Sequence, residues 1–293
     1  MELPFTLPPI HSTSEVPVWK NNHFRMGNDI TMVLQYHTNE NGWNDALTLF
    51  HEETAGDQHV IDRASRYHAG MQLKKNINNK FPTILEIGCS SGFMLQYMQQ
   101  IFPQALVMGA DIVTTPLLTL SQRMPRTPLF QFDLLRCPLP DQCLDAVVML
   151  NVLEHIEDDE AALKQVFRIL KPGGVLVLEV PAGPHLYDIY DKHLMHYRRY
   201  TLAELRAKVK KQLFSIKYES HLGVLMYPGF WWVKKRNQRF LTAPEVTQRQ
   251  IIEKNIQQTK SNLLLHGLMQ LELFLGRIVS YPAGIRAVMT CVR

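Results

Sequence analysis

Between residues 82 and 181, short apolar runs of strand length alternate with segments of helical periodicity. The runs are PTILEIGC, QALVMGAD, PLFQFD, CLDAVVMLN and VLVLEVP, with helices expected over 91–102, near 115–123 and over 157–170. The runs are nearly continuous in Val, Ile and Leu, which is typical of strands buried on both faces of a parallel sheet. This order predicts a doubly wound α/β fold with a mostly parallel sheet.

The rest of the chain adds elements before and after this core. Residues 57–75 have helical periodicity, whereas residues 1–55 are expected to form an extended arm with a helix near 42–51. The segment LFSIKYESH is a further strand. Residues 222–283 are mostly apolar with a helical period, and GIRAVMTCV is a last strand that we expect to return to the sheet.

The order of these elements predicts where the chain divides. A capping box formed by Thr201 and Glu204 is expected to begin a helix after the fifth strand. The predicted parts are a helical N-terminal arm over 1–56, a core over 57–221, a helical insertion or cap over 222–283, and the last of seven strands over 284–293.

Composition limits the classes of protein. The 293 residues suit one large domain, and the net charge of +4 does not by itself indicate a nucleic-acid partner. The four cysteines have no metal-ligand spacing, so reduced thiols and no metal site are predicted. The N-terminus lacks a signal-peptide pattern, and no run of about 18 apolar residues predicts a transmembrane helix, so a cytoplasmic location is expected.

Two glycines, Gly88 and Gly92, lie between the first strand and the following helix in the segment G-C-S-S-G. A tight turn of this kind lets backbone N–H groups approach a ligand. The middle glycine of the dinucleotide fingerprint G-x-G-x-x-G is absent, which weakens the interpretation as a pyrophosphate site. Glu86 stands two residues before the turn, and an acidic group suits a positively charged ligand better than two phosphates.

Later strands in the series also end on polar side chains. Asp111 ends the second strand, where a carboxylate can accept hydrogen bonds from both hydroxyls of a ribose. Asp133 ends the third strand, and Asn151 and His155 follow the fourth. Each residue alone could be a helix cap or a packing residue. Together, at successive strand ends, they predict a ligand site at the carboxyl edge of the sheet.

The glycine turn with Glu86, the strand ends at Asp111, Asp133 and Asn151, and the segment LKPGGVLVLEVP together resemble the class I S-adenosylmethionine-dependent methyltransferases. The resemblance extends over about residues 60 to 220. The resemblance implies a Rossmann-like fold and S-adenosylmethionine as the cofactor. It implies that the methionine part of the cofactor is lined by Glu86, Gly88 and Gly92, with Cys89 in the same turn, and contacts the backbone near Asn151. It also implies that Asp111 binds the ribose hydroxyls. The adenine is then bordered by Ile112, Asp133 and Leu134. The resemblance also suggests that Arg66, on a covering helix, pairs with the methionine carboxylate; a solvated helix face is the equal alternative.

The segment after the fifth strand, residues 181–201, is rich in His, Tyr and Arg. Its pattern D-x-x-x-x-H-x-R-R-Y-T resembles a subset of these methyltransferases. His196 or His155 is the candidate general base, because imidazole titrates near neutral pH. Asp191 either orients His196 or faces water. The candidate substrate-binding residues are Arg198, Arg199 and Tyr187. The alternative is that the arginines tie the loop to the sheet.

Two tryptophans, Trp231 and Trp232, stand beside the basic segment KKRNQR in the helical insertion. Trp next to basic residues suits peripheral contact with a membrane, or an apolar and anionic substrate. The alternative that we favour is a helical cap in which the tryptophans are buried and the lysines are exposed.

The sequence leaves three functions open. The favoured one is a methyltransferase that acts by in-line displacement on an O or N atom of a small molecule, such as a carboxylate, a hydroxyl or a lipid-linked intermediate. The second is an RNA or protein methyltransferase, although Asn151 is followed by VLE rather than PPY, PPF or PPW, and no separate basic module indicates nucleic acid. The third is a non-catalytic partner subunit that binds the cofactor. The missing glycine disfavours a dinucleotide dehydrogenase.

Overall fold

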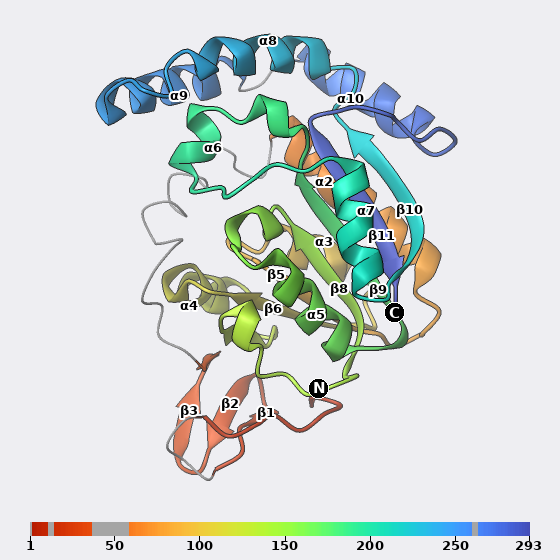
Figure 1. Ribbon diagram of the computed structural model, residues 1–293. Helices are drawn as coiled ribbons and strands as arrows, with labels where there is room; N and C mark the ends of the chain where they lie inside the picture. The colour runs from red at the N-terminus through yellow and green to blue at the C-terminus, as the bar shows by residue number, and fades with distance from the viewer. Residues whose placement is uncertain (1, 11–14, 37–58, 260–262) are drawn as a thin grey trace.

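The computed structural model describes residues 2–10, 15–36, 59–259 and 263–293. Its centre is an eight-stranded sheet with the order β10–β11–β9–β8–β5–β6–β7–β4 (Figure 1). The strands are β4 (Val33–Gln35), β5 (Thr83–Ile87), β6 (Leu106–Asp111), β7 (Leu129–Gln131), β8 (Leu144–Leu150), β9 (Leu170–Pro181), β10 (Ser215–Leu222) and β11 (Arg286–Val292). Only the β9–β11 and β11–β10 pairs are antiparallel. The predicted mostly parallel α/β fold is therefore confirmed, and the last strand does return to the sheet.

Helices cover both faces of this sheet. They are α2 (Val60–Asn76), α3 (Phe93–Ile101), α4 (Thr114–Arg123), α5 (Asp159–Ile169) and α7 (Leu202–Lys211). Apolar side chains of α2, α3 and α4 share one core with Ile84, whereas those of α5 and α7 share the opposite core with Leu85. Because consecutive residues of β5 point to opposite faces, both must be apolar, which explains the continuous Val, Ile and Leu runs.

The N-terminal arm differs from the prediction. Its described part contains no helix and forms a small antiparallel sheet of β1 (Val18–Lys20), β2 (His23–Met26) and β3 (Asp29–Thr31), followed by β4. Strand β4 pairs in parallel with β7 and adds an eighth strand to the predicted seven. The aromatic rings of Trp19, Phe24 and Phe130 pack in tilted pairs, with centroids 4.7 and 5.2 Å apart, and join the small sheet to β7. The helix expected near 42–51 lies outside the described residues.

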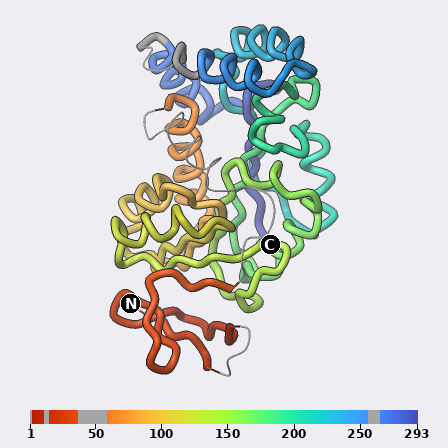
Figure 2. Tube along the Cα trace, turned by 90° about the vertical axis from the view of Figure 1, so that its left-hand side faces the viewer, coloured from red at the N-terminus to blue at the C-terminus, as the bar shows by residue number. Residues whose placement is uncertain are grey.

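The segment between β10 and β11 forms the three helices α8 (Tyr227–Gln238), α9 (Glu245–Thr259) and α10 (Leu263–Leu275). Figures 1 and 2 show these helices at the end of the molecule opposite the N-terminal strands. Met269 and Leu273 of α10 pack against Val60 and Ala64 of α2, so the insertion contacts the core. No helix in the described part of the chain is both long enough and apolar enough to cross a membrane.

The orientation of α8 contradicts the favoured expectation of buried tryptophans and exposed lysines. Trp231 and Trp232 are 43% and 59% exposed, whereas Lys234 is only 4% exposed. The reason is electrostatic, because the ammonium group of Lys234 pairs with two buried carboxylates, those of Asp188 and Asp191. Trp232, two residues before Lys234, lies on the opposite side of the helix and therefore turns outward when this lysine turns inward.

Candidate functional site

The predicted glycine turn joins β5 to α3. Gly88 and Gly92 both have a positive φ, +74° and +76°, a backbone conformation that favours glycine. A Cβ atom on Gly88 would lie 2.4 Å from the Val152 side chain, and one on Gly92 would lie 2.5 Å from the Leu120 side chain. Both glycines are thus required by the packing of the turn itself, in addition to any approach by a ligand.

A cavity of about 120 Å³ opens beside this turn. Six of the ten predicted cofactor-binding residues line it, namely Arg66, Glu86, Gly88, Cys89, Gly92 and Asn151. Its wall joins the turn to the carboxyl end of β8, to helix α2 and to the start of β11. The structure therefore brings together at one edge of the sheet residues that the sequence placed at separate strand ends.

The other four predicted residues are not among those that line this cavity. The carboxylate of Asp111 accepts hydrogen bonds from the backbone N–H of Ser90, at 2.9 Å, and of Val113, at 3.0 Å. It thereby ties the end of β6 to the glycine turn. Asp133 caps the 3-10 helix η1 (Leu134–Arg136) by accepting the N–H of Leu135. The roles of Asp111, Ile112, Asp133 and Leu134 at a ribose and adenine stay predictions.

Sequence reasoning missed the charged residues on the far wall of the cavity. Arg286, the first residue of β11, donates hydrogen bonds to Glu179 at 2.7 Å, to Ser65 at 2.8 Å and to Asp62. Burial lowers the pKa of Arg286, but the charges of Asp62 and Glu179 outweigh this effect and hold its pKa above the usual range. No local pattern could have found the group, because its members come from α2, β9 and β11.

Glu86 contributes a buried carboxyl group to the cavity wall. It is 5% exposed, and its Oε2 atom has no hydrogen-bond partner within the described residues. Burial, followed by the neighbouring charge of Asp111, raises its pKa well above the usual range, and the charge of Arg66 opposes that rise. Such a buried oxygen in a cavity wall can accept a hydrogen bond from a ligand, or pair with a positive charge on it.

The two candidate bases meet at the end of β8. His155 belongs to the 3-10 helix η2 (Leu153–His155), and its ring packs edge-to-face on that of His196, with centroids 4.6 Å apart. Asp191, in the short helix α6 (Ile189–His193), accepts a hydrogen bond from Nδ1 of His196 at 2.9 Å. Asp191 is fully buried, so it orients His196 and does not face water. Burial lowers the pKa of His196, and Asp191 opposes that effect.

The predicted substrate-binding residues have partners within the protein. Arg199 donates to Asp191 at 2.8 Å and to the carbonyl oxygen of Ala182 at 2.9 Å. Arg198 pairs with Asp159 at 2.7 Å. Ala182 directly follows β9, Asp191 belongs to α6 and Asp159 begins α5, so these contacts tie the segment to the end of β9 and to two helices. Separately, the Tyr187 hydroxyl donates to the backbone oxygen of His196 at 2.8 Å. A role of these residues in acceptor binding stays a prediction.

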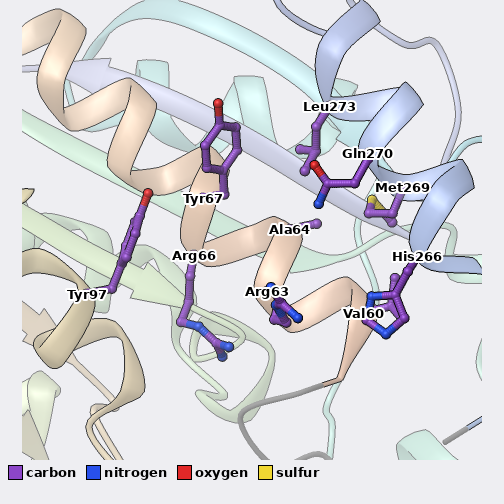
Figure 3. A pocket seen from close by; sticks show the side chains of 10 residues that line it. All are labelled: Val60, Arg63, Ala64, Arg66, Tyr67, Tyr97, His266, Met269, Gln270 and Leu273. Carbon is purple, nitrogen blue, oxygen red and sulfur yellow. The ribbon is translucent and has the colours of Figure 1, made fainter. Parts of the chain in front are cut away.

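A larger cavity of about 270 Å³ lies between α2, α3 and α10 (Figure 3). Its polar lining includes Arg63 and Tyr67 of α2, Tyr97 of α3, and His266 of α10. Arg66 lines this cavity and the smaller one, so the two share a wall. The helical insertion therefore forms part of the surroundings of the site.

Residues 85–178 match the model of a family described as a methyltransferase domain. The matched segment runs from β5 into β9 and includes the glycine turn. An S-adenosylmethionine-dependent methyltransferase of Mycolicibacterium smegmatis, so named, is 30% identical over 148 residues, which is 50% of this chain and 56% of that protein. A trans-aconitate 2-methyltransferase of Azoarcus is 30% identical over 39% of this chain and 43% of its own length. The chain thus spans about half the length of the curated relatives that it matches.

Solved structures support the fold of the methyltransferase domain. A chain from the complex of the Haloferax volcanii Trm112 methyltransferase activator with a methyltransferase superposes with a TM-score of 0.54, at 15% identity, over 85% of this chain and 97% of that chain. A phosphoethanolamine N-methyltransferase of Haemonchus contortus, solved with S-adenosyl-L-methionine, gives a TM-score of 0.51 at 16% identity, over 84% of this chain and 60% of that chain. At these identities the likeness concerns the fold alone.

Proposed function

We propose that this chain is an S-adenosylmethionine-dependent methyltransferase of class I that methylates an O or N atom of a small-molecule acceptor. The observation that carries the proposal is the cavity beside the glycine turn. It joins Glu86, which has a buried oxygen without a partner, to a turn fixed by Asp111 at the neighbouring strand end. S-adenosylmethionine is the cofactor. It carries the methyl group on a positively charged sulfonium sulfur, and the rest of the cofactor leaves as a neutral thioether once the methyl group is transferred.

The charges of the cavity suit the methionine end of this cofactor. Glu86 and Asp62 lie in the cavity wall, and their acidic character favours a positively charged group such as a sulfonium or an ammonium. Arg66 supplies the opposite charge for a carboxylate. Methyl transfer itself depends mainly on holding acceptor and donor in line, so a site that binds and orients is sufficient for much of the rate.

The acceptor is proposed to lie near His155 and His196, which stand at the end of β8 beyond Asn151. The relative named above for trans-aconitate favours a small acceptor. We also propose that the chain belongs to the subset of methyltransferases that carry the segment D-x-x-x-x-H-x-R-R-Y-T together with a helical C-terminal insertion. We also propose the four-part division at residues 56, 221 and 283.

A lipid-linked acceptor, with peripheral membrane contact, is a second proposal that a specific observation favours. The outward-facing Trp231 and Trp232 lie on the same helix as basic side chains, and the guanidinium of Arg236 stacks 5.2 Å from the ring of Trp232. Aromatic and basic residues together are typical of surfaces that contact a membrane interface.

Calorimetric titration of the full chain with S-adenosylmethionine and with S-adenosylhomocysteine tests the proposed function. We expect saturable binding of both, with Asp111→Asn weakening it about tenfold to 100-fold because one charged hydrogen-bond acceptor is lost. Asp141→Asn, at an exposed carboxylate, is the control that keeps full affinity. Absence of binding by folded protein would refute the proposal, and binding of NADH instead would favour a dehydrogenase.

Mass spectrometry of extracts incubated with labelled cofactor then separates the remaining functions. A labelled small molecule supports the proposal. Label in RNA or protein would support the second function, and cofactor binding without any labelled product would indicate a non-catalytic partner subunit.

A further inference from the structure

Three donor side chains meet beside the carboxyl end of β8. Glu154 and His155 come from η2, and His196 comes from the segment that follows α6. One donor atom of each residue, a carboxylate oxygen or a ring nitrogen, lies within 4.8 Å of the other two. The backbone N–H of Tyr197 donates to the carbonyl oxygen of Glu154 at 2.8 Å, which fixes the His196 segment against η2.

Glu154 is fully buried, and neither of its carboxylate oxygens has a hydrogen-bond partner in the described part of the chain. Burying a carboxylate without a partner costs on the order of several kcal/mol. Such a group takes up a proton unless a cation or a donor completes it. The two imidazole rings beside it are donors of the kind that bind metal ions.

Asp191 gives His196 the orientation of a metal ligand. Its Oδ1 atom lies 2.9 Å from Nδ1 of His196, and because a carboxylate only accepts, that ring nitrogen carries the proton. The lone pair is therefore on Nε2. A carboxylate that holds the outer nitrogen of a histidine is the usual support for a metal-bound imidazole. Arg199 and Lys234 hold Asp191 in turn.

We propose that Glu154, His155 and His196 bind one divalent cation of the Mn²⁺, Co²⁺ or Zn²⁺ class, and that an acceptor oxygen takes an open position on it. This inference rests on the proposed methyltransferase function and narrows its acceptor to an oxygen compound. Three protein ligands leave positions open for a substrate. Metal–ligand bonds of about 2.0–2.2 Å require the three donor atoms to close to about 3–4 Å of one another.

A bound cation explains how the acceptor would be activated. It lowers the pKa of a coordinated O–H group, so that the proton passes to solvent water at neutral pH. The acceptor oxygen then forms a bond to the methyl carbon while the bond from that carbon to the sulfonium sulfur breaks, and its electron pair stays on the sulfur. In this scheme His155 and His196 act as ligands, and neither serves as the general base.

The test is a titration of the full chain, freed of metals by chelation and dialysis, with Co²⁺ alone. We expect one equivalent to bind with the visible absorption of cobalt in a nitrogen–oxygen site. Glu154→Gln and His196→Gln are each expected to weaken binding about 100-fold or more, and Asp191→Asn about 10- to 100-fold through the orientation of His196. His221→Gln, at a histidine outside the cluster, should keep full affinity.

The titration is repeated with Mn²⁺ and followed by electron paramagnetic resonance, because cysteine sulfur is a poor ligand for Mn²⁺ and the four buried cysteines would not compete for it. Folded wild-type protein that binds neither cation, or equal affinity in wild type and in the folded ligand variants, would overturn the site. If Glu154→Gln does not fold, His196→Gln decides. S-adenosylmethionine titrated in the presence of chelator separates the two failures: retained cofactor binding without metal binding overturns the cation site alone, whereas lost cofactor binding overturns the proposed function.

Discussion

The ammonium group of Lys234 lies 2.9 Å from Oδ2 of Asp191, whose other oxygen, Oδ1, lies 2.9 Å from Nδ1 of His196. Lys234 belongs to the helical insertion and His196 to the segment over the site, so a single buried carboxylate joins the two. The same ammonium group also pairs with Asp188, at 2.7 Å. The insertion is therefore part of the structure that orients His196.

Replacing Lys234 by methionine is expected to destabilise the protein by about 3–5 kcal/mol, because Asp188 and Asp191 lose a buried positive partner. The free energy of unfolding in urea measures the loss. Lys235→Met is the matched control on the same helix, since Lys235 donates to the backbone oxygen of His185 and to Gln238 near the surface; it should cost less than about 1 kcal/mol. Equal losses in the two variants would contradict the structural role of Lys234.

Arg66 lines both cavities, whereas Arg63, on the same helix, lines only the larger one. If Arg66 pairs with the methionine carboxylate as proposed, Arg66→Gln should weaken S-adenosylmethionine binding about tenfold, because that positive charge is lost. Arg63→Gln should leave the affinity unchanged. Calorimetric titration of the two variants measures this difference, and an equal effect of both would place the methionine carboxylate elsewhere.

His68 of α2 predicts how stability depends on pH. Burial lowers its pKa to about 4, while the unfolded chain keeps a value near 6.5. The folded state therefore disfavours the protonated ring, so this contribution is complete above about pH 6.5 and is lost as the pH falls toward 4. The loss amounts to about 3 kcal/mol. His68→Leu should remove this pH dependence. The measurement is the free energy of unfolding of the wild type and of the variant at pH 7 and at pH 4.5. Parallel pH profiles of the two proteins would contradict the prediction.

The exposed tryptophans predict binding to membranes. Trp232→Ala and Trp231→Ala should each weaken co-sedimentation with vesicles containing anionic lipid about tenfold, because each removes a large apolar group from the contact. Leu213 lies just after α7 and is 78% exposed, so Leu213→Ala is the control and should bind vesicles as the wild type does. Wild-type protein that stays in the supernatant would refute the membrane contact.

Much of the fold could be predicted because its signals are local. The capping box of Thr201 and Glu204 forms as expected, since the two residues lie one helical turn apart. The glycine turn and the strand-end position of Asp111 also follow from neighbouring residues. The strands of the N-terminal arm were missed because three or four residues are too few to show a period, and their order depends on contact with Phe130 of β7.

The sequence by itself determined the alternation of strands and helices, the turn between Gly88 and Gly92, and the edge of the sheet beside which the cavity opens. The tertiary structure decided which distant groups share a site: Arg286 with Asp62 and Glu179, and His196 with Glu154. It also decided that Lys234 turns inward and the tryptophans outward. Secondary structure depends on interactions between near neighbours, whereas the partner of a buried charge is chosen by packing, which periodicity in the sequence does not report.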